Sequence, residues 1–175
     1  MREIKYWRTA RARKGPSLPL MLIMNRLNLI APYGKILDYG CGRGADVKFL
    51  QLKGFDAVGY DPYFEEYNHP ELLADDTYDV VLCFYVLNIV LPEERHEILE
   101  DIKRILKPSG EAYIAVRDKS EKILGIPYED GVITITGTFQ KTFSAEELED
   151  LLKKHFDYVE IISKRRPLLA VVRKW

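Results

Sequence analysis

The apolar residues of the chain gather in short runs that alternate with segments of helical spacing. Residues 80–85 form a continuous apolar run, which is typical of a strand covered on both faces. Ile98, Ile102 and Ile105 repeat at helical spacing and predict the buried stripe of a helix that begins at Pro92. The remaining pattern predicts strands at 36–39, 57–60 and 112–117, a short edge strand at 132–136, and helices at 18–30 and 45–53.

The C-terminal part of the pattern predicts one helix followed by two strands. Ser144 and Glu147 form a capping box, which predicts a helix to about residue 155. Residues 158–163 and 168–173 predict two strands, and the short connection between them predicts antiparallel pairing. The alternation of strands and helices therefore predicts an α/β fold with a Rossmann-like, mostly parallel sheet and a C-terminal antiparallel strand pair.

Length and composition are typical of an ordinary globular protein. The 175 residues suit a single domain over 1–175, and 47% of them are hydrophobic and 30% charged. The longest apolar stretches are shorter than the ~20 residues that a membrane helix needs. Cys41 and Cys83 are too few for a disulfide framework or a metal cluster. We expect a cytoplasmic protein that binds neither a metal nor a membrane.

Charge is unevenly distributed along the chain. Residues 1–53 carry 11 basic and 3 acidic side chains (+8), whereas residues 54–102 carry 1 and 13 (−12), and the total is −1. Residues 1–17 form a basic N-terminal arm with Tyr6 and Trp7 among its cations. Cations for phosphates and aromatic rings for stacking suit a nucleic-acid partner, DNA or RNA. A solvated arm packed by the two aromatic residues is the alternative.

One motif carries most of the chemistry. Residues 36–44 read ILDYGCGRG, and residues 58–61 read VGYD after a helix-length interval. An apolar strand, a glycine turn, a helix and a strand that ends in an acid form a nucleotide-binding βαβ unit. Glycines let the backbone approach a ligand closely. The Asp61 carboxylate can accept hydrogen bonds from both hydroxyls of a ribose.

The chain resembles the class I S-adenosylmethionine-dependent methyltransferases over residues 36–175. The resemblance rests on the two segments above, on YDVVLCFYVLNIV (78–90), on ILKPSGEAYIAVR (105–117) and on the late antiparallel pair. It implies S-adenosylmethionine as the cofactor and methyl transfer as the reaction, with Asp61 binding the ribose. The residues that it places against the cofactor are Asp38, Gly40, Cys41, Gly42, Gly44, Asp61, Pro62, Phe84 and Tyr85.

The chain departs from this family between the second and third core strands. The family usually has another strand there, but residues 62–78 show no clear strand, so the sheet is predicted to lack or shorten one. Asp75 and Asp76 are then the candidates for an acid near the adenine. Three aromatic residues either line the pocket or cover the shortened sheet edge: Tyr63, Phe64 and Tyr67.

The acceptor of the methyl group is less well defined by the sequence. Asn88, Arg117 and Gln140 are the candidate catalytic or substrate-side residues, and a helix-cap role suits Asn88 equally well. No residue stands out as a general base. A narrower resemblance, to small putative methyltransferases associated with DNA phosphorothioation systems, rests on segments such as KGPS (14–17) and GTFQ (137–140).

Nucleic acid is the leading acceptor class, slightly ahead of a small molecule. Two alternatives come from other functional classes. Gly40, Gly42 and Ala45 also fit the fingerprint of an NAD(P)-binding oxidoreductase. A non-catalytic module that binds nucleic acid through the arm is the other.

Overall fold

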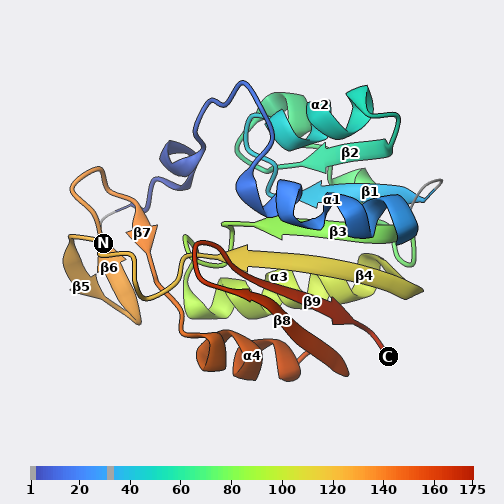
Figure 1. Cartoon of the computed structure of the whole chain (residues 1–175). Coiled ribbons are helices and arrows are strands. Elements are labelled where there is room, and N and C mark those ends of the chain that lie inside the picture. Colours follow the sequence, from blue (N-terminus) through green and yellow to red (C-terminus); the bar gives the residue numbers. More distant parts are fainter. Residues whose placement is uncertain (1–2, 31–33) are drawn as a thin grey trace.

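The computed structural model describes residues 3–30 and 34–175. A six-stranded sheet of order β2-β1-β3-β4-β9-β8 forms its centre (Figure 1). Strands β1 to β4 pair in parallel, and β9 is antiparallel to both β4 and β8. The predicted Rossmann-like fold with a C-terminal antiparallel pair is therefore confirmed. The strands are β1 (Lys35–Tyr39), β2 (Asp56–Tyr60), β3 (Tyr78–Phe84), β4 (Leu106–Val116), β8 (Tyr158–Lys164) and β9 (Leu168–Arg173).

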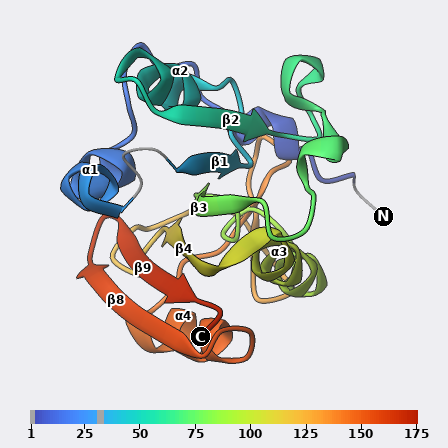
Figure 2. The same cartoon turned by 90° about the vertical axis from the view of Figure 1, so that its right-hand side faces the viewer.

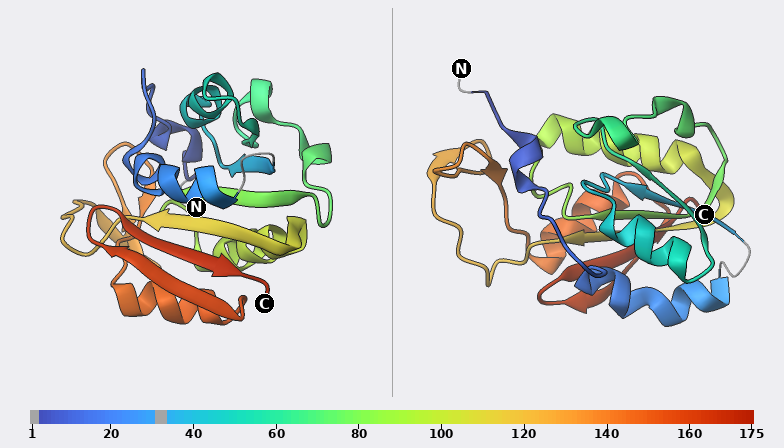
Figure 3. Two further views of the ribbon diagram at one scale, coloured as in Figure 1. Left: turned by 45° about the vertical axis from the view of Figure 1, so that its right-hand side comes forward. Right: turned by 90° about the horizontal axis from the view of Figure 1, so that it is seen from above.

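Helices cover both faces of this sheet, as the views in Figures 2 and 3 show. The first two pack on one face, where Leu20, Ile23 and Leu27 are fully buried. The other two pack on the opposite face. No helix in the described ranges is long and apolar enough to cross a membrane. The helices are α1 (Leu18–Ile30), α2 (Ala45–Leu52), α3 (Pro92–Ile105) and α4 (Ala145–Lys153).

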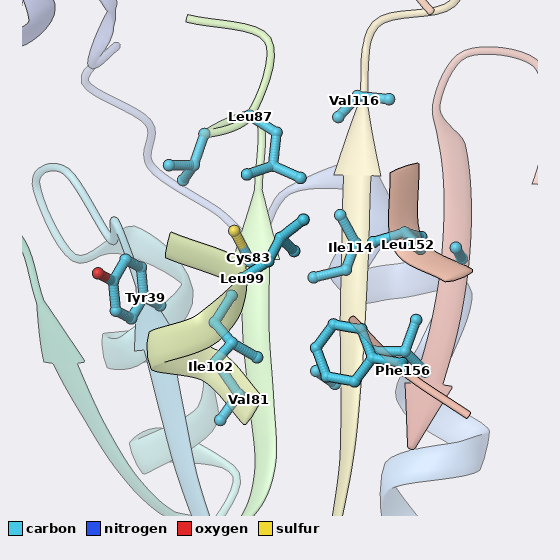
Figure 4. Packing of buried hydrophobic residues seen from close by; sticks show 14 of the residues in the cluster. Tyr39, Val81, Cys83, Leu87, Leu99, Ile102, Ile114, Val116, Leu152 and Phe156 are labelled. Atoms are coloured by element: carbon cyan, nitrogen blue, oxygen red, sulfur yellow. The ribbon is translucent and has the colours of Figure 1, made fainter. Parts of the chain in front are cut away.

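Helix α3 contributes fully buried residues to the core on its face. Leu99 and Ile102 are fully buried and belong to one cluster with Val81 and Cys83 of β3 (Figure 4). Each such side chain contributes roughly 1.5–3 kcal/mol of hydrophobic free energy on burial. The predicted stripe was partly wrong, because Ile98 is only half-buried and Leu99 takes the inward position.

The ends of the elements follow their local sequence signals. Ser144 Oγ accepts from Glu147 N at 3.1 Å and the Glu147 carboxylate accepts from Ser144 N at 2.7 Å, so the predicted capping box is confirmed. Strand β4 begins at Leu106, six residues earlier than predicted. Its pairing with β3 shifts between Tyr78↔Leu106 and Val80↔Glu111, so residues 107–110 bulge out of the ladder.

The interval after β2 contains no strand. Residues 62–77 form loops and two short 3₁₀ turns, η2 (Glu65–Tyr67) and η3 (Pro70–Leu72). The prediction of a missing strand is confirmed, and β2 becomes the edge of the sheet. Pro70 opens the second turn, where its lack of an N–H donor costs nothing.

A small second sheet lies beyond the carboxyl ends of β1 to β4, on the same side as the N-terminal arm (Figure 1). Of the short edge strand predicted at 132–136, only residues 132 and 133 belong to a strand, and that strand lies between the other two strands of this sheet instead of at an edge. Lys5 N donates to Gly137 O at 3.0 Å, which ties the arm to it. Its strands are β5 (Ile126–Tyr128), β6 (Gly131–Ile133) and β7 (Phe139–Gln140).

Candidate active site

A cavity of about 600 Å³ lies where the carboxyl ends of the parallel strands meet the arm. In open α/β sheets this edge is the usual place for a ligand. Most of the residues predicted for the site line it: Gly40, Cys41, Gly42, Asp61, Pro62, Phe84, Tyr85, Asn88, Arg117 and Gln140. Asp38 and Gly44 do not line it.

Asp61 holds the glycine turn against the end of β2. Its Oδ2 accepts from Gly42 N at 2.8 Å, and its Oδ1 accepts from Tyr63 N at 2.9 Å. Burial raises the pKa of Asp61, although the N–H groups of Tyr63 and Gly42 act in the opposite direction. A carboxylate has about four acceptor positions, so each oxygen can still accept from a ribose hydroxyl.

The glycines of the turn are required by the packing of the protein itself. Gly40 and Gly44 have φ of 77° and 74°, values that favour glycine. A Cβ on Gly40 would collide with Val86, and one on Gly44 would collide with the phenol of Tyr67. The sequence analysis explained these glycines by the approach of a ligand. For Gly44 the structure shows a different reason, and its contact with a cofactor stays a prediction.

Asp38 lies buried on β1, behind the wall of the cavity. Burial and the nearby Asp46 raise the pKa of its carboxyl well above the usual value, and Arg13 lowers it. Burial and Asp38 likewise raise the pKa of the Cys41 thiol, which keeps it protonated and unreactive. The contact of Asp38 with the cofactor, which the resemblance implies, stays a prediction.

The chain leaves β3 through a strained residue. Tyr85 has φ of 60°, and its N–H donates to Ala115 O of β4 at 2.8 Å. A left-handed conformation is uncommon for an aromatic residue, and such strain tends to occur at functional sites. Asn88 follows in this loop and is 1% exposed. Leu91 is the N-cap of α3, so the alternative of Asn88 as a helix cap is wrong.

The N-terminal arm forms a roof over the cavity. Tyr6 stacks on Tyr63 with ring centroids 5.4 Å apart, and its hydroxyl donates to Glu94 Oε2 at 2.8 Å. Burial and Glu94 raise the pKa of Tyr6, so the phenol remains a donor. The sequence analysis did not predict this role for the arm. The arm residues that line the cavity are Tyr6, Trp7, Thr9, Ala10, Arg11, Arg13, Pro16 and Ser17.

Two predicted acids lie at the wrong end of the sheet. Asp75 pairs with Arg104 at 2.5 Å, and Asp76 pairs with Lys174 at 2.6 Å. Both precede β3, whose carboxyl end faces the cavity, and neither lines it, so they do not serve the adenine. Of the three aromatic residues in this interval, Tyr63 and Phe64 line the cavity, whereas Tyr67 packs behind it against Gly44.

Residues 6–159 match a family of methyltransferase domains. The chain belongs to this methyltransferase family. A comparison with curated proteins gives no match. The PH0226 protein of Pyrococcus horikoshii OT3 is a similar solved structure, with a TM-score of 0.67, 21% identity, and coverage of 98% of this chain and 99% of that one.

Two further structures in this group are methyltransferases by name. The 1,6-didemethyltoxoflavin-N1-methyltransferase of Burkholderia thailandensis holds 1,6-didemethyltoxoflavin and S-adenosylhomocysteine (TM-score 0.67, 17% identity, 90% of this chain and 78% of that one). The CcbJ methyltransferase of Streptomyces caelestis has a TM-score of 0.62 at 16% identity, covering 95% and 94%. These likenesses concern the fold. The prediction of a methyltransferase that uses S-adenosylmethionine as its methyl donor agrees with the family and with these neighbours.

The oxidoreductase alternative loses its main support. It requires that the N-terminus of the helix after the glycine turn be open to a pyrophosphate. In this structure Asp46, in the first turn of α2, accepts from Ser17 N and Ser17 Oγ, both at 2.6 Å. The start of α2 is therefore covered by Ser17 of the arm, which is bound to the helix's own carboxylate.

Proposed function

We propose that this protein transfers the methyl group of S-adenosylmethionine to a small-molecule acceptor bound in the cavity. The observation that carries the proposal is the roof: the arm lies across one side of the site and is joined to three separate parts of the protein. These joints are Tyr6 to Glu94, Lys5 to Gly137, and Ser17 to Asp46. A small molecule fits beneath such a roof, whereas a nucleic-acid strand needs an open surface.

The cations of the arm support the same acceptor class. Arg13 pairs with Asp46 at 3.2 Å, and Arg8 donates to Thr136 O at 3.1 Å. These side chains brace the arm against the protein, so fewer of them are left for phosphates. The sequence favoured nucleic acid; the roofed cavity favours a small molecule. The narrower resemblance to proteins of DNA phosphorothioation systems would instead favour DNA, and the experiments below separate the two.

S-adenosylmethionine supplies an electrophilic methyl group on a sulfonium sulfur. The acceptor lone pair forms the new bond to carbon as the carbon–sulfur bond breaks, and the bonding pair stays on sulfur. In this proposal Asp61 would bind the ribose, the glycine turn would hold the methionine part, and Phe84 and Tyr85 would flank the methyl group. Holding both partners in line supplies on the order of 7–11 kcal/mol of the barrier reduction.

Calorimetry with S-adenosylhomocysteine tests the cofactor part. The wild type should bind it, and Asp61→Ala should abolish binding. Asp157→Ala, at an exposed site outside the cavity, is the matched control and should bind normally. NADH should give no heat. Binding of NADH instead of S-adenosylhomocysteine would support an oxidoreductase and overturn the proposal.

The acceptor class needs a separate measurement. Duplex DNA and RNA should not be methylated. They should also show no binding of the kind whose affinity falls steeply between about 50 and 200 mM salt. Product formation on either nucleic acid, lost when residues 1–14 are deleted, would overturn the small-molecule acceptor while leaving methyl transfer intact. Salt-sensitive binding without any product would indicate a non-catalytic nucleic-acid module.

A further inference from the structure

Asn88 carries a buried polar atom that the protein does not satisfy. The side chain is 1% exposed and lines the cavity, and Oδ1 has no hydrogen-bond partner among the described residues. Its Nδ2 donates only a long bond, 3.4 Å, to Gln140 Oε1. Buried polar groups are nearly always paired in folded proteins, so an orphan in a binding cavity indicates a ligand atom.

The loop around Asn88 is held rigidly. Asn88 O accepts from Lys141 N at 2.8 Å, next to Gln140 in the chain. On either side, Leu87 O accepts from Arg95 Nε at 2.9 Å and Val90 O accepts from Arg95 Nη2 at 3.0 Å. These bonds fix the backbone on both sides of Asn88, so the side chain starts from a defined position at the cavity wall.

Asn88 and Gln140 together present two complementary polar atoms. The Asn88 amino group donates to the Gln140 oxygen. The pair therefore keeps the Asn88 oxygen as an acceptor and the Gln140 amino group as a donor. Exchanging oxygen and nitrogen in both amides reverses their positions but preserves one donor and one acceptor. A matching ligand carries a donor and an acceptor side by side, as on the N–H/C=O edge of a lactam or the corresponding edge of an amidine.

The walls beside this pair suit a flat ring. Phe84 and Tyr85 line the same cavity from the end of β3, and Val86 and Ile89 add apolar surface from the loop that follows. Aromatic and apolar walls with a few convergent polar groups are the usual composition of a site for a small heterocycle.

We propose that Asn88 and Gln140 recognise the methyl acceptor, and that this acceptor is a heteroaromatic ring with a lactam or amidine edge. The inference rests on the proposed function and adds the chemical class of its acceptor. Both residues act in recognition and orientation of the ring.

The test is calorimetry on the full chain saturated with S-adenosylhomocysteine. The probes are 2-pyridone, uracil, xanthine, pterin and 2-aminopyridine, each with a counterpart methylated on the edge nitrogen. At least one parent ring should bind, and its methylated counterpart should bind weaker by roughly tenfold or more. Asn88→Leu should weaken the parent ring by a similar factor and leave the affinity for S-adenosylhomocysteine unchanged. The matched control is Gln51→Leu, whose side chain lies outside the cavity and donates to Ala57 O.

The outcomes separate this inference from the proposed function. Failure of the wild type to bind S-adenosylhomocysteine would overturn the proposed function. Normal cofactor binding with no parent ring bound, or with equal binding to Asn88→Leu, would overturn only the acceptor site.

A stability measurement distinguishes recognition from a structural role. Asn88→Leu with Gln140→Leu replaces both amides by apolar groups, so the midpoint of urea unfolding should be unchanged or higher. A clearly lower midpoint, together with loss of ring binding, would assign both residues to the fold and overturn the proposal.

Discussion

Asp46 joins the N-terminal arm to helix α2 through Ser17, whose N–H and hydroxyl each donate to its carboxylate at 2.6 Å. Both residues are buried. A carboxylate in the first turn of a helix is favoured by the helix dipole. Since Ser17 Oγ also accepts from Leu20 N at 3.3 Å, the same residue caps α1. One contact thus sets the start of α1 and the place where the roof of the cavity is anchored.

Ser17→Ala should therefore destabilise the protein and loosen the arm. Loss of the cap and of one hydrogen bond to a buried carboxylate should cost about 1–3 kcal/mol of the free energy of unfolding. Urea unfolding measures this cost, and trypsin should cleave the basic arm faster in the variant. Ser109→Ala, at an exposed site, is the control. Equal stability of the two variants would show that the arm is not anchored here.

The affinity for S-adenosylhomocysteine should depend on pH through Asp61. Burial raises its pKa, so the carboxylate takes up a proton at a higher pH than the ~3.9 of a free aspartate. The protonated form loses acceptor capacity for a ribose hydroxyl, so affinity should fall as the pH is lowered, beginning above ~3.9. Calorimetry across pH measures the effect. Asp61→Asn should bind weakly with a flat profile; an unchanged profile would assign the dependence to another group, such as Asp38.

A comparison of Gly44 with Gly54 measures how much stability a side chain in the glycine turn would cost. Both have positive φ, 74° and 88°, but an added Cβ meets Tyr67 at Gly44 and open space at Gly54. Gly54→Ala should cost about 1–2 kcal/mol from the backbone alone. Gly44→Ala should cost an additional ~1–3 kcal/mol from overpacking. Equal losses in urea unfolding would mean that Tyr67 moves aside without cost.

Arg95 should contribute far more to the free energy of unfolding than Arg104, an exposed arginine of the same helix. It is 3% exposed, binds Leu87 O and Val90 O, and pairs with Asp130 at 2.5 Å. Arg95→Met leaves these oxygens without their partner, and such losses typically cost about 3–5 kcal/mol. Arg104→Met breaks exposed ion pairs and an exposed hydrogen bond to Leu73 O, and should cost less than ~1 kcal/mol. Equal midpoints in urea would contradict the role of Arg95 in holding the loop of Asn88.

The elements themselves were largely predictable from local patterns. The helix at 18–30 has the predicted bounds, and the two final strands pair as their short connection implied. Asp61 was predictable as a site residue because it ends a strand at a fixed interval after the glycine turn. The stripe of α3 was less certain, since Ile98 and Leu99 are adjacent and both fit a helical face.

The predictions that failed concern residues whose position depends on other segments. Asp75 and Asp76 have the right residue type but precede β3, so their carboxylates lie at the opposite edge of the sheet. The function of the basic arm was predicted from its composition. Composition does not show that Tyr6 binds Glu94, 88 residues away. Composition records which charges are present and not which partners they meet.

Spacing and residue type along the chain settled the α/β architecture, the glycine turn and the acid that faces it, because these depend on hydrogen bonds and burial between close neighbours in sequence. The roof over the cavity, the anchor of Ser17 on Asp46 and the amide pair of Asn88 with Gln140 depend on contacts between residues 29 to 132 positions apart. Such contacts exist only after the parallel strands have brought their carboxyl ends to one edge, where the packing of loops selects which polar atoms meet and which one is left for a ligand.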